Sequence, residues 1–181
     1  MTRSGLALLA MLSSWATQAV GAPALVPRQD VSVTYRTEQG GHVLEQQMRW
    51  SVKSQRFRID PPAPGMFVLV DYVAHRMQIV QERDRSFMEM DAPASLPSLG
   101  APSSGLYTQG ADDRVAGLAC TEWTLAAGGE PAGICVTEDG VLLRVRMGTR
   151  TLATASVVSY APQDLALFRV PDGYTRAVSP R

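Results

Sequence analysis

A glycine pair, Gly40-Gly41, separates two segments in which apolar and polar residues alternate, and this pattern predicts a tight antiparallel hairpin. A type I′ turn needs a positive φ at both central positions, which glycine adopts without steric cost. Pairing outward from the turn places Val31 opposite Trp50 and Val33 opposite Met48. One face of the hairpin is then apolar and the other polar, as in an antiparallel sheet that is covered on one side.

The alternation continues beyond this hairpin. A second turn at Ser54-Gln55 would place Trp50 opposite Ile59. Proline donates no ladder hydrogen bond, so the proline-rich run at 61–65 should interrupt the sheet before it resumes. Further strands are expected at 66–70, 76–81, 86–90, 114–119, 120–125, 133–138, 141–147 and 152–160. Helical spacing is not convincing in the first half of the chain, and the predicted fold is mainly β, an antiparallel meander forming a half-open barrel with little helix.

Residues 92–110 differ in composition from the rest, with three prolines, four serines and few apolar residues. They predict a long loop, for which a functional flap and partial disorder are equally supported. About 160 residues are enough for one core, so a single domain is expected over 29–177.

The N-terminus predicts an export signal over residues 1–21. Arg3 supplies a positive charge, 5–12 form an apolar stretch, and small residues follow at Gly21 and Ala22. The apolar stretch is shorter than the roughly 20 residues of a membrane span. The alternative is an uncleaved amphipathic N-terminus. We expect a periplasmic or secreted protein that is soluble after signal cleavage.

The two cysteines, Cys120 and Cys135, fall in a predicted hairpin of an exported protein, which favours a structural disulfide. Closing this loop should add about 3 kcal/mol to the free energy of unfolding. A redox-active pair is the less favoured alternative, because such thiols usually form Cys-x-x-Cys at a helix start. The turn at Asp139-Gly140 sets Cys135 opposite Arg144 and Val136 opposite Leu143, so the disulfide is expected on the outer or rim side of the sheet.

Most other chemistry finds no support in the sequence. Basic and acidic residues balance at 17 each, which argues against a nucleic-acid partner. His42 and His75 fall at turns without metal-ligand spacing, and Ser104 lacks the Gly-x-Ser-x-Gly context of a nucleophile. We therefore expect no catalytic residues, no cofactor and no metal site, and hence no enzyme.

The strongest candidate site is an apolar face rich in aromatic and methionine side chains. Methionine is flexible and polarizable, so such a surface can adapt to varied apolar ligands. Ordinary core packing is the alternative for the same residues. The candidate ligand face comprises Met48, Trp50, Phe57, Met66, Phe67, Met77 and Phe87.

Several of these segments resemble the LolA/LolB-like periplasmic lipoprotein carriers. The resemblance rests on the meander segments 67–71, 77–80 and 85–90 and on the closing Phe-x-x-Pro-x-Gly-Tyr pattern of 168–174. The segments 115–123 and 135–144 are similar to a bacterial branch of that superfamily whose function is not assigned. The resemblance covers about residues 30–176.

The resemblance implies a half-open antiparallel barrel whose concave apolar face is covered by helices and, in the carriers, holds acyl chains. Here the proline-rich loop is a poor helix, so we expect a smaller or more open cavity. The leading hypothesis is a non-catalytic domain that binds an apolar or amphipathic ligand, such as a lipid or lipoprotein segment. The alternative is an interaction or sensor module that presents its sheet or loop to another envelope protein.

Overall fold

The computed structural model describes residues 21–177 except 98, 102 and 127–129; the predicted signal peptide, residues 1–21, lies almost entirely outside the described residues. One short 3-10 helix, η1 (Leu165–Phe168), accompanies twelve strands. The strands are β1 (Val31–Gln39), β2 (His42–Ser51), β3 (Arg56–Asp60), β4 (Met66–Asp71), β5 (Arg76–Gln81), β6 (Ser86–Asp91), β7 (Tyr107–Val115), β8 (Leu118–Leu125), β9 (Ala132–Val136), β10 (Leu142–Met147), β11 (Arg150–Ser159) and β12 (Thr175–Arg176).

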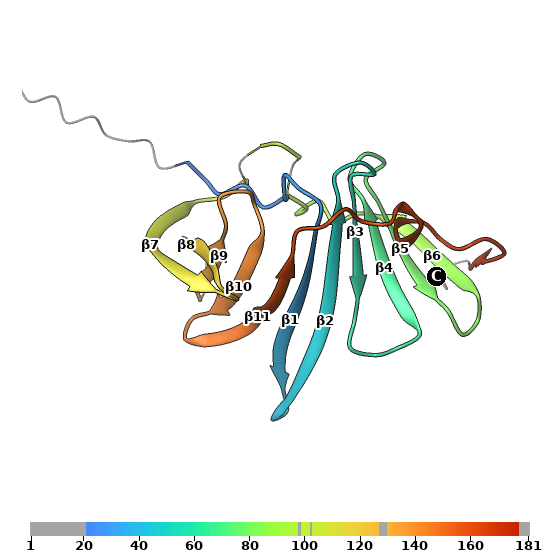
Figure 1. The fold of residues 1–181 in the computed structure, drawn as a ribbon, viewed down its shortest axis with the longest axis horizontal. Coiled ribbons are helices and arrows are strands. Elements are labelled where there is room, and N and C mark those ends of the chain that lie inside the picture. The colour runs from blue at the N-terminus through green and yellow to red at the C-terminus, as the bar shows by residue number, and fades with distance from the viewer. Residues whose placement is uncertain (1–20, 98, 102, 127–129, 178–181) are drawn as a thin grey trace, which may run out of the picture.

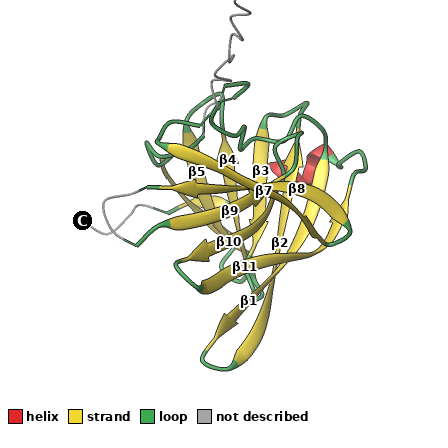
Figure 2. Cartoon of the chain, turned by 90° about the vertical axis from the view of Figure 1, so that its left-hand side faces the viewer, coloured by secondary structure: helices red, strands yellow, loops and turns green. Residues whose placement is uncertain are grey.

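All twelve strands belong to one sheet, in the order β12-β6-β5-β4-β3-β2-β1-β11-β10-β9-β8-β7. Neighbours pair antiparallel except β12, which runs parallel to β6. Figure 1 shows the strands side by side from β7 at the left to β6 at the right, and Figure 2 shows the curved sheet from its β7 end, with most loops along the upper rim. The sheet does not close into a barrel, and the predicted mainly β, half-open antiparallel architecture with little helix is confirmed.

The register of the first hairpin agrees with the prediction, since Val31 pairs with Trp50 and Val33 with Met48. The second turn was placed wrongly. Trp50 pairs with Phe57 rather than Ile59, because the turn comprises four residues, Val52–Gln55, and not two. A shift of two residues preserves the side-chain period, so the predicted apolar face survives the error.

The predicted loop at 92–110 ends earlier than expected, because β7 begins at Tyr107. The expected strand at 114–119 is also wrong: the chain turns at Ala116-Gly117, both with positive φ, and Val115 pairs with Leu118 across this turn. The polar composition of β7 concealed the strand, whose residues 108–114 are all exposed.

Cys120 and Cys135 form a disulfide with a Cα–Cα distance of 5.5 Å. They are 4 % and 0 % exposed and belong to the main core, so their expected position on the outer or rim side was wrong. The physical reason is a bulge in β10. Leu142 pairs with Val136, and Arg144 pairs with Cys135. The strand therefore has one additional residue, Leu143, which lies with Arg144 opposite Cys135. Leu143 is fully buried in the same core as the disulfide.

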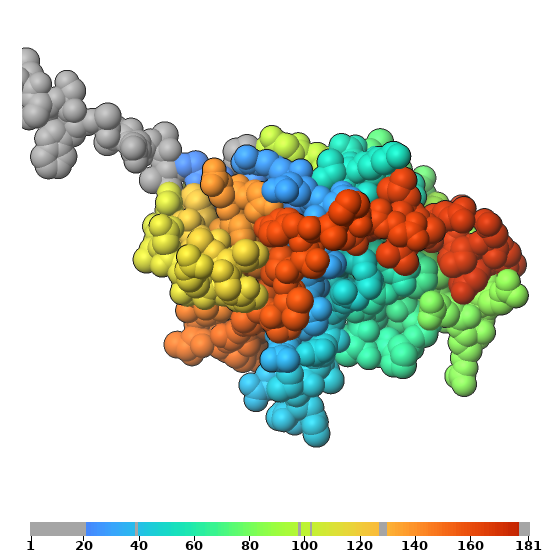
Figure 3. Space-filling model, in the orientation of Figure 1, coloured from blue at the N-terminus to red at the C-terminus, as the bar shows by residue number. Residues whose placement is uncertain are grey.

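The other face of β4–β6 carries a second, smaller core that the C-terminal segment covers. Phe67, Leu69 and Val80 are fully buried there. The Arg58 guanidinium lies 3.7 Å from the centre of the Phe67 ring and donates to the Leu167 carbonyl of η1. Figure 3 shows the C-terminal segment, in red, running across the visible face of the molecule.

Two arginines of β3 hold this segment through backbone carbonyls. Arg56 donates to the Phe168 carbonyl at 2.9 Å and to the Asp71 carboxylate at 2.8 Å. Burial raises the pKa of the Asp71 carboxyl, but hydrogen bonds from Ala74 and Arg56 outweigh it and hold that pKa below its usual value.

The described part of the chain contains no helix with the length and hydropathy of a membrane span.

Removing the disulfide should weaken the fold. The variant C120A/C135A frees a loop with a sequence separation of 15, so we expect the free energy of unfolding to fall by about 3 kcal/mol in urea denaturation. The reduced wild-type protein is the matched control and should lose a similar amount. An unfolding midpoint unchanged in both would contradict a stabilising role for the bond.

Asp71 should make stability depend on pH. Its folded pKa lies below the unfolded value, so its contribution is complete above about pH 4 and is lost as the pH falls through the folded pKa. Urea midpoints at pH 6 and pH 3 should therefore differ less in Asp71→Asn than in the wild type. Asp84→Asn, in an exposed turn, should retain the wild-type difference. An Asp71→Asn protein with an undiminished difference would refute this role.

Candidate functional site

The candidate site lies on the concave face of the sheet, where paired residues form a continuous apolar row. Trp50 pairs with Phe57, Phe57 with Val70, and Val70 with Met77. Directly paired side chains of neighbouring strands share a face, so these four residues lie in line across β2 to β5. Trp50, Phe57 and Val70 are all at least nine-tenths buried.

Two extended segments cover this face, in place of the helices that the resemblance implied. One is the N-terminal segment 22–28, whose Arg28 amide donates to the Asp139 carbonyl at 2.9 Å. The other is the proline-rich loop, from which Leu96 and Leu99 pack against the core. Ser103 joins them, since its amide and its hydroxyl both donate to the Pro23 carbonyl, at 2.9 and 2.7 Å.

An apolar cavity of about 220 Å³ remains between the sheet and this cover. The cover contributes residues from both segments, and β1 to β4 supply most of the floor. The lining residues are Leu25, Pro27, Val31, Val33, Met48, Trp50, Phe57, Ile59, Val70, Tyr72, Leu96, Pro97, Gly140, Val141 and Leu142. None of these side chains carries a charge at neutral pH, so the cavity suits a hydrocarbon group.

A second recess, of about 490 Å³, adjoins the first and shares Trp50 and Pro27 with it. It lies between the two cover segments and the turn that follows β2. Its lining is more polar and comprises Ala22, Ala24, Val26, Pro27, Arg28, Trp50, Val52, Gln55, Leu99, Gly100 and Ala101. The two spaces therefore meet at one indole ring.

Trp50 belongs to an aromatic cluster, with Phe57 and Tyr72, that lines the first cavity. The Trp50 ring centre lies 4.6 Å from that of Phe57 and 5.4 Å from that of Tyr72. Burial raises the pKa of the Tyr72 hydroxyl to about 12, which reflects the low polarity of the site. Such tilted and edge-on pairs stabilise a structure beyond the effect of their buried area, so the cluster helps to hold this side of the cavity in place.

The structure brings together only part of the predicted ligand face. Met48, Trp50 and Phe57 line the cavity, and Met77 packs beside it against the main core. Met66 shares the concave face by strand alternation but borders a separate recess at the far end of β4.

Phe67 and Phe87 were assigned to the wrong face. They are paired with Val80 in successive strands and lie in the second core beneath the C-terminal segment. The reason is that 66–70 is an unbroken apolar run, in which alternation between faces leaves no trace in the sequence.

Sequence reasoning missed the residues of the cover. Leu25 and Pro27 precede the predicted domain, and Leu96 and Pro97 belong to the segment expected to be a loop. The available signal was the few apolar residues within otherwise polar or proline-rich stretches. It was too weak to predict which surface they contact.

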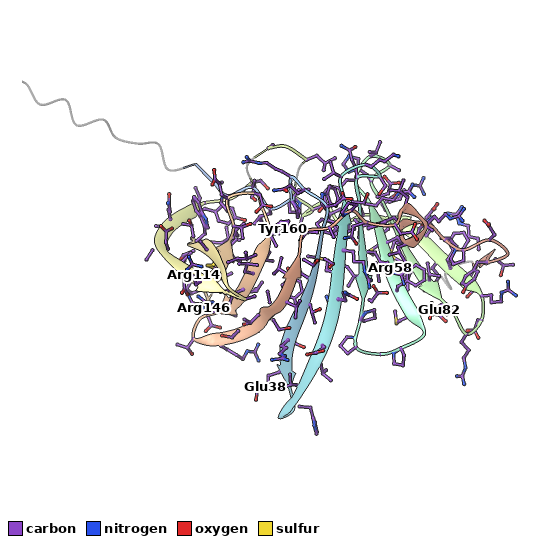
Figure 4. The ribbon with its side chains drawn as sticks, viewed as in Figure 1. Glu38, Arg58, Glu82, Arg114, Arg146 and Tyr160 are labelled. Atoms are coloured by element: carbon purple, nitrogen blue, oxygen red, sulfur yellow. A yellow bond between two sulfur atoms is a disulfide. The ribbon has the colours of Figure 1, made fainter. Side chains whose placement is uncertain are left out.

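A cluster of charges lies on β7 to β10, near the labelled Arg114 and Arg146 in Figure 4. Arg144 forms ion pairs with Asp113 and Glu122, and Arg146 pairs with Glu122 at 2.9 Å. Hydrogen bonding from Arg144 lowers the pKa of the Asp113 carboxyl. Each carboxylate lies beside an arginine, an arrangement typical of a structural ion-pair network rather than of acid–base catalysis.

No family model and no curated protein matches this sequence. Solved structures with a similar fold include an uncharacterized conserved protein from Thermus thermophilus, with a TM-score of 0.59, 11 % identity, and coverage of 82 % of this chain and 90 % of that one. MucB gives a TM-score of 0.54 at 12 % identity, covering 82 % and 59 %. PNGF-II in the C2 space group gives 0.53 at 11 % identity, covering 83 % and 31 %. At these identities the likeness shows the fold alone.

The connection between the two cover segments should be measurable by hydrogen exchange. Ser103→Ala removes the hydroxyl bond to Pro23, so we expect amides of 22–28 to exchange about fivefold faster, as the loss of roughly 1 kcal/mol would produce. Ser156→Ala is the matched control, since it removes a hydroxyl bond to the Thr34 carbonyl on β1 and should leave 22–28 unaffected. Equal exchange in both variants would show that Ser103 does not hold the cover.

Proposed function

We propose that this chain is an exported, non-catalytic binding protein that takes an apolar or amphipathic ligand, such as a lipid or lipoprotein segment, into the covered cavity. The observation that carries the proposal is the apolar space of about 220 Å³ beneath the cover. Protein interiors are close-packed, and voids larger than a water molecule are few. Ligand sites are typically lined by apolar and aromatic side chains, and this space is large enough for a hydrocarbon group rather than for a whole drug-sized molecule.

The character of the lining supports an apolar ligand over a polar one. Water needs two to four polar partners to occupy a buried space, and apolar cavities of comparable size stay dry. The cavity offers the polar atoms of Trp50 and Tyr72 and some backbone groups, but no charged side chain among the described residues that line it. A hydrocarbon group would gain burial there without displacing well-bound water.

The disulfide supports export. A buried Cys120–Cys135 bond persists in oxidising compartments and is rare in the cytosol. The described lining side chains also include no nucleophile beside a base and no pair of carboxylates, which supports binding over catalysis. Binding of a protein partner is the alternative function, and failure of a ligand to enter the cavity in the quenching experiment below would favour it.

Fluorescence quenching can test ligand entry directly. Trp123→Phe leaves Trp50 as the single tryptophan after residue 20. A fatty acid brominated near the end of its chain should then quench Trp50 emission saturably, because bromine quenches only at close approach. Val70→Phe should fill the cavity and abolish quenching, whereas Val157→Phe, on an exposed position of β11, should retain it.

Overpacking costs about 1–3 kcal/mol, so each variant should first be shown to be folded by circular dichroism. Ile59→Phe, which fills the cavity from β3, provides a second variant if Val70→Phe does not fold. Absence of saturable quenching in the folded Trp123→Phe protein would refute the proposal and favour the interaction module.

A further inference from the structure

The two adjoining spaces differ in chemistry, and this difference assigns an orientation and a head group to the ligand. This inference rests on the proposed function. The first cavity has an uncharged, almost wholly apolar lining, whereas the second is bordered by the side chains of Arg28 and Gln55. They meet at Trp50 and Pro27, so one amphiphilic molecule could occupy both.

The polar groups around the second recess are rich in hydrogen-bond donors. The lining residues include Arg28, whose side chain carries a guanidinium, and Gln55, whose amide can donate. No aspartate or glutamate occurs among the described residues that line this recess. Such a set favours an acceptor with negative charge.

Trp50 supplies an independent observation. The indole is 2 % exposed, and its Nε1 is buried without any hydrogen-bond partner among the described residues. A buried donor left unpaired costs about 1–3 kcal/mol, and such groups in native proteins call for an explanation. This unpaired donor belongs to the residue that lines both spaces.

Arg28 is placed to meet a charged group at the mouth of the recess. Its side chain is exposed, while its amide is fixed to the Asp139 carbonyl at 2.9 Å. Within the described residues no carboxylate lies within 4.0 Å of its guanidinium, although ten such ion pairs occur elsewhere in the described chain. Its charge is therefore available to a ligand.

We propose that the ligand is a single-chain amphiphile with an anionic head, a carboxylate or a phosphate. Its hydrocarbon tail occupies the cavity beneath Leu25 and Leu96, and its head lies in the second recess against Arg28 and Gln55. Trp50 lines both spaces and therefore lies where the tail and the head meet. The cover segment 22–28 thus contributes to recognition of the head as well as to enclosure of the tail.

The test compares twelve-carbon amphiphiles that differ only in the head: dodecanoate, dodecyl phosphate, dodecanol and dodecyltrimethylammonium. Binding is measured by isothermal titration calorimetry on the Trp123→Phe protein. We expect both anions to bind at least about fivefold more tightly than the alcohol, the factor that roughly 1 kcal/mol from an exposed ion pair provides, and the cation to bind most weakly. Free phosphate and acetate, which have no tail, should not bind at millimolar concentration.

Arg28→Gln should reduce the ratio of dodecanoate affinity to dodecanol affinity to about one. Arg150→Gln, also an exposed arginine but at the start of β11, is the matched control and should preserve the preference. Equal affinities for dodecanoate and dodecanol, or an unchanged preference in Arg28→Gln, would overturn the anionic-head inference while leaving the proposed function intact. Failure of all four amphiphiles to bind would refute the proposed function itself.

Discussion

The structure depends on one constraint, which is that a single curved antiparallel sheet must bury its concave apolar face without a helix to cover it. Trp50, Phe57 and Val70 lie in line on that face. The chain covers them with two extended segments, 22–28 and the proline-rich loop. Extended segments present fewer side chains per unit length than a helix, so the cover is incomplete and a cavity remains.

The opposite face of β4 to β6 is also apolar, and it is the C-terminal segment that covers it. Phe67 and Leu69 alternate with concave-face residues along β4 and would be exposed on the outer surface. Arg56 and Arg58 bind carbonyls of η1 and hold the C-terminal segment over these residues. Each face of β4 is thus buried by a segment distant in sequence, so both must be in place before β4 is fully desolvated.

How far the sequence predicted this arrangement differs from one feature to another. The Gly40-Gly41 turn gave the correct register because its φ requirement admits few alternatives, whereas the turn after β2 lacks glycine and was placed two residues wrong. The apolar run at 66–70 could not reveal its two faces. Strand β7 was hidden because an exposed edge strand needs no apolar residues.

The residues of the candidate site also divide into those that local sequence predicts and those that it does not. Met48, Trp50 and Phe57 follow from strand alternation, a local property, and they line the cavity as expected. Leu25 and Leu96 depend on contacts between segments about 70 residues apart, which composition does not encode. The position of the disulfide failed for a related reason, because a single bulge at Leu143 changes which neighbours share the face of Cys135.

The contacts of the disulfide-linked core differ from those of the cover, and this difference bears on how a ligand could reach the cavity. The disulfide, Leu143 and Tyr35 form a fixed part of the core, with the Tyr35 hydroxyl donating to the Leu142 carbonyl at 2.5 Å. In the cover, Arg28 is bonded to the Asp139 carbonyl, and Ser103 joins the two cover segments through the Pro23 carbonyl. Local opening of a segment breaks only its own contacts, so separation of the cover would break these bonds and leave the disulfide and the sheet pairing intact. A ligand could therefore enter without disturbing the disulfide-linked core.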